Sequence, residues 1–218
     1  MATAAAPRRS LRTRDTRWAV LGAKWLAARG VRPNPVSVMS VVFSALAGTA
    51  FIASASSSGR DQILLLVCAA LLVQLRLLCN MLDGMLAVEG GLKSALGDIY
   101  NDLPDRIADS LILVGAGYSI SASTWGPLLG WSAALLAVIT AYVRLLAGAL
   151  GATQHFCGPM AKQHRMFAVT IAALVGAVEA ASGLAPRAML VALVVIVAGS
   201  AITAARRVRR TALELEAR

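Results

Sequence analysis

Long apolar stretches follow one another through most of this 218-residue chain, and they constrain its fold more than any other feature. A hydrocarbon core of about 30 Å requires a helix of roughly 20 apolar residues. Six stretches approach that length, at about 36–57, 62–87, 99–120, 124–149, 166–183 and 186–205. In lipid such segments form helices, because a helix satisfies its own backbone hydrogen bonds. The sequence therefore predicts an all-α polytopic membrane protein, a six-transmembrane-helix bundle.

The composition agrees with lipid as the main solvent of this chain. Apolar residues make up 58% of it and charged residues 15%, and the mean hydropathy is +0.70. The net charge of +10 would form a patch interleaved with aromatic residues in a nucleic-acid-binding protein. Here the basic residues flank apolar stretches instead. We therefore expect membrane lipid as a partner and no nucleic acid.

The basic residues also indicate an orientation. Eight Lys and Arg residues precede Pro33, and Arg206, Arg207, Arg209 and Arg210 follow the last stretch. Lys and Arg accumulate on the cytoplasmic side of membrane proteins. An even number of spans then places both termini in the cytoplasm, and we take the membrane to be a bacterial inner membrane.

Three parts are expected along the chain. Residues 1–33 form a basic cytosolic N-terminus with an interfacial helix, in which Trp18, Leu21 and Trp25 have helical spacing. Residues 34–205 form the transmembrane domain, and residues 206–218 form a basic cytosolic tail. Pro33 and Pro35 separate the interfacial helix from the first span.

Acidic residues are concentrated where an apolar protein should have few. Six of the eleven fall between positions 83 and 109, and four of these lie inside expected spans. A carboxylate at membrane depth costs roughly 2.5 to 3.5 kcal/mol, so it normally faces a cavity, a partner or a cation. Ion pairs with Arg76 and Arg106 account for some of the acids, but two cations are few for so many carboxylates.

Helix geometry gathers these polar residues into two stripes. The stripe in the second span follows i, i+4, i+7, i+8, i+11 spacing and consists of Arg76, Asn80, Asp83, Gly84 and Ala87. The stripe in the third span lies within about 60° around the helix axis and consists of Asp98, Asp102, Asp105 and Asp109, with Asn101 beside it. Two oxygen-rich stripes are suited to a divalent cation such as Mg²⁺, Mn²⁺ or Ca²⁺.

The two stripes resemble the signature of the CDP-alcohol phosphotransferases, D-x2-D-G-x2-A-R-x8-G-x3-D-x3-D, and the spacing matches throughout. The positions that agree are Asp83, Gly84, Ala87, Gly97 and Asp105. Asn80 and Asn101 replace two acids of the signature, and Val88 replaces its arginine. The resemblance extends over nearly the whole chain, since the helix number and the basic cluster after the fourth span also match the family.

The resemblance implies an enzyme of phospholipid biosynthesis, which transfers a phosphatidyl group from CDP-diacylglycerol to an alcohol and releases CMP. It also implies an active site on the cytoplasmic side, a Mg²⁺ or Mn²⁺ cofactor and a homodimer. The residues that it assigns to the metal are Asn80, Asp83, Asn101 and Asp105, and those that it assigns to the CDP-lipid are Asp83, Gly84, Ala87 and Gly97. Asp105 would accept the hydroxyl proton as general base.

Three basic residues, Arg144, Lys162 and Arg165, resemble those that in the family receive the phosphate of an acceptor alcohol. This favours a phosphorylated acceptor such as glycerol 3-phosphate. Without the resemblance they would be either a positive pocket at the inner face or snorkelling anchors.

The departures from the signature point to supporting residues. Asp98 and Asp102 would replace the charge lost at the two asparagines, and Arg76 or Lys93 would replace the arginine missing at Val88. We expect Asp109 to be dispensable for turnover, because it lies about one helical turn deeper than Asp105.

Two other functions stay open from the sequence. A catalytically inactive lipid-binding relative would keep the fold, and asparagines at ligand positions are compatible with it. A small membrane transporter would have discontinuous helices or repeats around a midplane site, whereas these polar clusters lie near one membrane face. The sequence favours the transferase.

Overall fold

The computed structural model describes residues 17–89, 96–120 and 123–218, and in this part the secondary structure is entirely helical. The helices are α1 (Arg17–Ala28), α2 (Pro33–Ala55), α3 (Gly59–Glu89), α4 (Gly97–Tyr118), α5 (Trp125–Ala149), α6 (Lys162–Ala181) and α7 (Ala188–Glu216). The all-α prediction is confirmed, and α2 to α7 coincide with the six expected stretches. One difference is α7, which continues as a helix through most of the expected tail to Glu216.

Five helices of the described part are long and apolar enough to cross a membrane, namely α2, α3, α5, α6 and α7. The chain is therefore an integral membrane protein. The helix α4 falls outside this group, since it carries the charged residues Asp102, Asp105, Arg106 and Asp109. The count of six spans stays a prediction, because it requires α4 to cross the membrane with its charges held inside the bundle.

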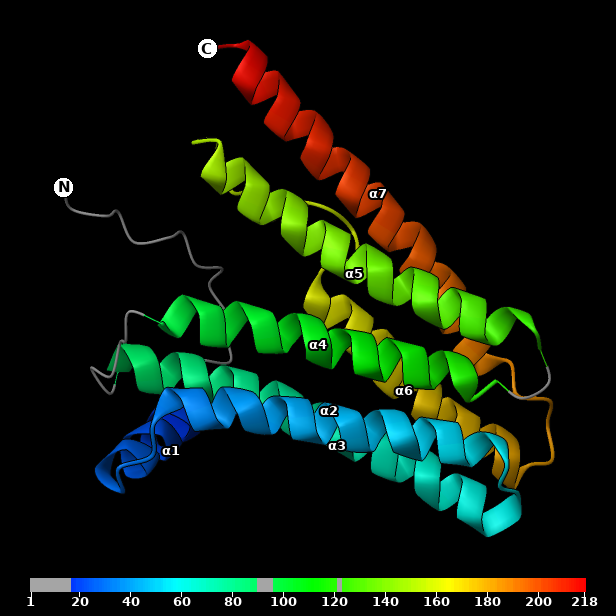
Figure 1. Cartoon of the computed structure of the whole chain (residues 1–218). Coiled ribbons are helices and arrows are strands. Elements are labelled where there is room, and N and C mark those ends of the chain that lie inside the picture. The colour runs from blue at the N-terminus through cyan, green and yellow to red at the C-terminus, as the bar shows by residue number, and fades with distance from the viewer. Residues whose placement is uncertain (1–16, 90–95, 121–122) are drawn as a thin grey trace.

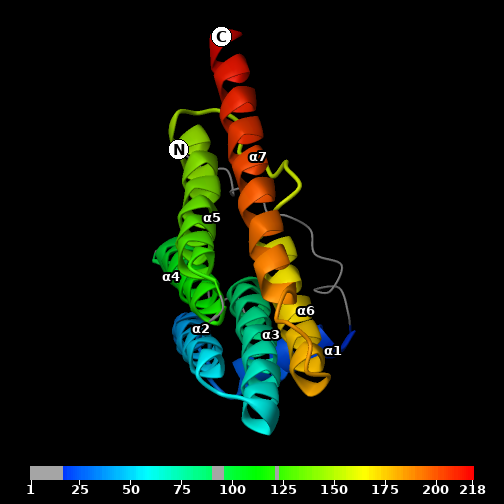
Figure 2. The ribbon, with the colours of Figure 1, turned by 90° about the vertical axis from the view of Figure 1, so that its right-hand side faces the viewer.

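The six long helices follow one another around a closed ring in the order α2, α3, α6, α7, α5 and α4, and each contacts its two neighbours. Figures 1 and 2 show α2, α3 and α4 running side by side, with α5 and α7 inclined to them and the C-terminal part of α7 projecting beyond the rest. The order around the ring differs from the order along the chain. As a result α4 lies between α2 and α5, and α3 lies between α2 and α6.

Small residues allow α4 to lie very close to both of its neighbours. A Cβ atom on Gly115 of α4 would lie 2.5 Å from the Cα atom of Gly48 in α2. A Cβ atom on Gly130 of α5 would likewise lie 2.9 Å from the Cα atom of Gly117 in α4. Close backbone contact of this kind stabilises helix pairs in lipid, where apolar side chains gain little by leaving the solvent.

The first helix packs across one end of the ring, against α3. Ala23 of α1 is buried with Met85 of α3, whereas Leu21 and Trp25 are exposed. Proline separates α1 from α2, since α2 begins at Pro33, where a proline loses no helical hydrogen bond. The position of α1 at a membrane interface stays a prediction, and the Trp18 side chain lies outside the described residues.

Candidate active site

Three aspartates of α4 each bind a cation from a neighbouring helix, near the end of the bundle where α4 begins. Arg144 Nη2 of α5 lies 3.0 Å from Asp102 Oδ1. From α6, Lys162 Nζ donates to Asp105 Oδ2 at 2.5 Å. Arg165 Nη2, one turn later, donates to Asp109 Oδ2 at 3.0 Å. The three described aspartates of the predicted stripe therefore face the neighbouring helices, and their charges are paired there.

A cation from the other side of the ring joins this row. Arg76 of α3 donates through Nη2 to Asp109 Oδ1 at 2.5 Å and to Asp105 Oδ1 at 3.4 Å. Asp109 is thus bound between Arg76 and Arg165, and all three side chains are at most 3% exposed. This buried triad connects α3, α4 and α6.

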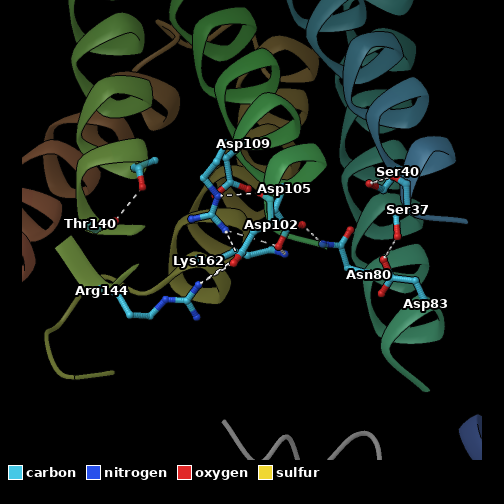
Figure 3. Close-up of polar contacts among 12 residues, drawn as sticks. Ser37, Ser40, Asn80, Asp83, Asp102, Asp105, Asp109, Thr140, Arg144 and Lys162 are labelled. Atoms are coloured by element: carbon cyan, nitrogen blue, oxygen red, sulfur yellow. Dashed lines mark hydrogen bonds and ion pairs between the residues drawn. The ribbon is translucent and has the colours of Figure 1, made fainter. Parts of the chain in front are cut away.

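The polar residues of α3 meet α4 and α2 in the same region, as Figure 3 shows. Asn80 Nδ2 donates to Asp105 Oδ1. One turn further, Asp83 Oδ2 accepts a hydrogen bond of 2.6 Å from the Ser37 hydroxyl of α2. The amide oxygen of Asn80, Oδ1, and the second carboxylate oxygen of Asp83, Oδ1, are both buried and have no hydrogen-bond partner among the described residues.

Those two free oxygens are the feature of the site that fits a metal ion. Buried carbonyl and carboxylate oxygens without a partner are costly, and hard divalent cations take oxygen ligands of this kind. Asp105 adjoins Asn80, so three of the four predicted metal ligands lie together. Within the described residues, no group of three or more His, Cys, Asp or Glu side chains forms a ready metal site. A cation would here depend on amide oxygen as well as carboxylate.

Cations outnumber acids in the described part of this site. Arg106 lies 3.6 Å from both Asp102 Oδ1 and Asp105 Oδ2. The five cations are Arg76, Arg106, Arg144, Lys162 and Arg165, and the four carboxylates are Asp83, Asp102, Asp105 and Asp109. Only Arg76 and Arg106 were expected to pair with the acids, because the contacts of α5 and α6 with α4 do not follow from the sequence. The excess positive charge suits an anionic ligand such as a phosphate.

The loop between α5 and α6 sets the position of Lys162 and Arg165, and α7 holds that loop. The Met160 amide donates to Thr203 Oγ1 at 3.0 Å. Gly158 of the loop has φ +119° and lies so close to Thr203 that a Cβ atom would be 2.5 Å from its Cγ2. Arg165 Nη1 also donates to the Met160 carbonyl, at 3.2 Å. The loop and α7 therefore fix where α6 begins.

The remaining predicted residues lie at the edge of this site. Gly84 and Ala87 are half-buried on α3, and Gly97 is the first residue of α4. Asn101 is exposed and makes no side-chain contact recorded in the described part, so its place among the ligands stays a prediction. Lys93 and the side chain of Asp98 lie outside the described residues.

Ser37 is a site residue that the sequence analysis missed. It is buried, as are Ser40 and Ser44 on the same face of α2. Three serines at i, i+3, i+7 spacing in an apolar span form a polar stripe, which marks the face of α2 turned toward the acids of α3. This serine spacing could have identified Ser37 from the sequence.

Comparisons with known proteins concern the fold. No protein-family model matches the chain, and no curated protein matches it. The chain does match crystal structures of the phosphatidylinositol phosphate synthase of Mycobacterium tuberculosis. Its complex with manganese and citrate matches over 88% of this chain and 88% of its own, with 22% identity and a TM-score of 0.74.

A second structure of the same synthase, with CDP-DAG bound, matches over 90% of this chain and 94% of its own, with 22% identity and a TM-score of 0.75. The apo form matches over 87% of this chain and 93% of its own, also with 22% identity, at a TM-score of 0.70. The protein therefore shares the fold of this synthase along nearly its whole length.

Proposed function

We propose that this protein is a CDP-alcohol phosphatidyltransferase, which transfers a phosphatidyl group from CDP-diacylglycerol to an alcohol and releases CMP. The observation that carries the proposal is the meeting of Asp105 with Asn80 and Lys162, beside the free oxygens of Asn80 and Asp83. Asn80, Asp83 and Asp105 occupy signature positions at unbroken spacing, with Asn80 in place of an acid. The shared fold supports the proposal, since a protein of that fold was crystallised with CDP-DAG.

Each group has a role in such a transfer. The acceptor hydroxyl attacks the phosphatidyl phosphorus, the bond from that phosphorus to CMP breaks, and Asp105 takes the hydroxyl proton. Lys162 must release Asp105 Oδ2 for this step, and its side chain is 26% exposed, so it has room to move. A Mg²⁺ or Mn²⁺ ion held by Asn80, Asp83, Asp105 and Asn101 would neutralise the diphosphate and the leaving CMP. The manganese in a neighbour of this fold supports that cofactor.

The acceptor that we propose is a phosphorylated alcohol such as glycerol 3-phosphate. Arg144 is paired with Asp102 but still 20% exposed, and Arg106 beside it is 22% exposed. These guanidinium groups are able to bind phosphate at the rim of the site. Arg165, predicted for the same task, is buried against Asp109, so its contribution would be through the local field. We also propose that the site faces the cytoplasm and that the protein forms a homodimer.

The direct test is CMP release by the purified protein in micelles, with labelled CDP-diacylglycerol, Mn²⁺ or Mg²⁺ and a panel of alcohols. We expect release with glycerol 3-phosphate or inositol phosphate. Turnover of neutral or zwitterionic alcohols alone would exclude a phosphorylated alcohol as the acceptor. Binding of CDP-diacylglycerol without release for any alcohol would instead favour an inactive lipid-binding relative, which the two asparagines at ligand positions keep as the second candidate.

A further inference from the structure

Arg76 places a permanent positive charge beside the candidate metal ligands. Its side chain is 0% exposed, and a guanidinium stays protonated at any physiological pH. Nη2 contacts both Asp105 and Asp109. Nε and Nη1 are also buried and have no hydrogen-bond partner among the described residues. A buried cation that contacts two carboxylates and keeps free donors does part of what a metal ion does in such a site.

Asn80, one turn further along α3, is a neutral side chain that is compatible with the positive charge of Arg76. Asn80 donates to the same Asp105 oxygen that Arg76 contacts. An aspartate at position 80 could not make that donation, and its charge would face the Asp105 carboxylate. A neutral amide therefore fits a site in which Asp105 already has a cation. The amide at position 80, where the signature has an acid, and the buried Arg76 therefore both serve to bind the same oxygen of Asp105.

We propose that Arg76 is a resident cation of this site, and that the site consequently binds a single divalent cation, held by Asn80, Asp83 and Asp105. The inference rests on the proposed function, which supplies the need for a divalent cation. A fixed guanidinium repels a second divalent ion at short range, and the amides at positions 80 and 101 lack the charge to hold one.

Lys162 does not have the same role, although it also contacts Asp105. Its side chain is 26% exposed and flexible, so a metal ion or substrate is able to displace it. Arg76 is enclosed on all sides and bound to Asp109 at 2.5 Å. Of the two cations, only Arg76 is fixed in the site whatever ligand is bound.

The experiment is a Mn²⁺ titration of the purified protein in micelles, in which electron paramagnetic resonance measures the free ion. This counts bound ions without any turnover. We expect one Mn²⁺ per chain in the wild type. N80D/N101D should also bind a single Mn²⁺ per chain, with higher affinity than the wild type. R76M should tighten Mn²⁺ binding by about tenfold or more, since a neighbouring charge shifts ionic equilibria by one to three log units. R60M, at an exposed position of the same helix, should leave binding unchanged.

Two ions per chain in the wild type would overturn the inference, and so would a second ion in N80D/N101D while Arg76 is intact. Neither result depends on the folding of an Arg76 variant. Unchanged Mn²⁺ affinity in a folded R76M protein, or no Mn²⁺ binding at all, would overturn it as well. CMP release is measured in parallel. CMP release with two bound ions would exclude only the proposal that Arg76 is a resident cation. One bound ion without CMP release for any alcohol would support that proposal and exclude the transferase function.

Discussion

Asp109 illustrates, at the scale of single residues, how burial changes what an acid does. Its carboxylate lies between Arg76 and Arg165 and is 3% exposed. Asp109→Asn would leave Arg165 without its carboxylate partner and Arg76 with only the longer contact to Asp105. Breaking a buried pair in this way typically costs about 3 to 5 kcal/mol. We expect a marked fall in the thermal unfolding midpoint in detergent. The sequence analysis expected Asp109 to be dispensable for turnover, and the structure adds a large structural role.

The matched control for Asp109 is Asp61→Asn, an exposed acid in the first turn of α3. It should unfold within a degree or two of the wild type, since exposed charges contribute little to stability. An Asp109→Asn protein as stable as this control would show that Asp109 is not needed to balance Arg76 and Arg165.

Asp105 is expected to act on chemistry more than on folding. Asp105→Asn keeps the shape of the side chain and removes the acceptor of the proton, so CMP release should fall by roughly 10² to 10⁴-fold. Asp109 still balances Arg76, and the protein should remain in the membrane fraction as a folded species. Activity above about a tenth of the wild type would exclude Asp105 as the general base.

The contacts that could be expected from the sequence share one property: they follow from spacing within a single helix or between two helices consecutive in the chain. Asn80 and Asp83 lie on one stripe of α3, and Asn80 contacts Asp105 of the next helix. The ion pairs of Arg144, Lys162 and Arg165 with α4 could not be predicted. They join segments 42 to 57 residues apart, and only the packing of the ring decides which acid each cation reaches.

Helix α4 depends, at the scale of elements, on its glycine contacts with α2 and α5. Gly115→Ala places a methyl group where Gly48 lies, with its Cα only 2.5 Å away. The two backbones must separate, and overpacking of this kind costs about 1 to 3 kcal/mol. We expect a lower thermal unfolding midpoint and, because α4 carries Asp105, a lower rate of CMP release.

The control for this packing is Gly176→Ala in α6, where the described residues offer the added methyl group one contact, with Leu66 Cδ1 at 3.6 Å. That is an ordinary contact, and alanine is also the better helix former. The control should be as stable as the wild type or more so. If both glycine variants behaved alike, helix propensity and not close approach would determine the stability of α4.

The lengths of the elements were largely predictable, and the exceptions have physical causes. Apolar length set α2, α5 and α6 to within a few residues. The helix α7 continues beyond the predicted span to Glu216, because a helix need not stop where its apolar segment stops. The residues after Arg206 continue the helix, and Glu214 of this segment accepts a hydrogen bond from the Thr153 amide at 2.9 Å, so the extension is held against the loop before α6.

The closed ring of six helices, at the scale of the whole molecule, brings one end of α3, α4, α5 and α6 together. Asp83 near the end of α3 and Lys162 at the start of α6 both lie at this end. The turns from α2 to α3 and from α6 to α7 lie at the opposite end, as Figure 1 shows. The alternation of helices predicted from the sequence thus gathers the candidate site at a single end of the bundle. Neither the ring order nor the contacts of α4 with α2 and α5 could be derived from hydropathy, which carries no information on neighbours.

The orientation of this bundle in the membrane is the last prediction. The basic residues around α1 and after α7 indicate that the end carrying the site faces the cytoplasm. In a variant without the free cysteines Cys68, Cys79 and Cys157, single cysteines at Ser58 and Ser182 should react with an impermeant maleimide added to intact cells. Both positions are exposed in turns at the far end. A cysteine at Ala217 should react only after the membrane is permeabilised. Labelling of Ala217 from outside would place the candidate site on the outer face of the membrane, and the proposed cytoplasmic position of the site would be wrong.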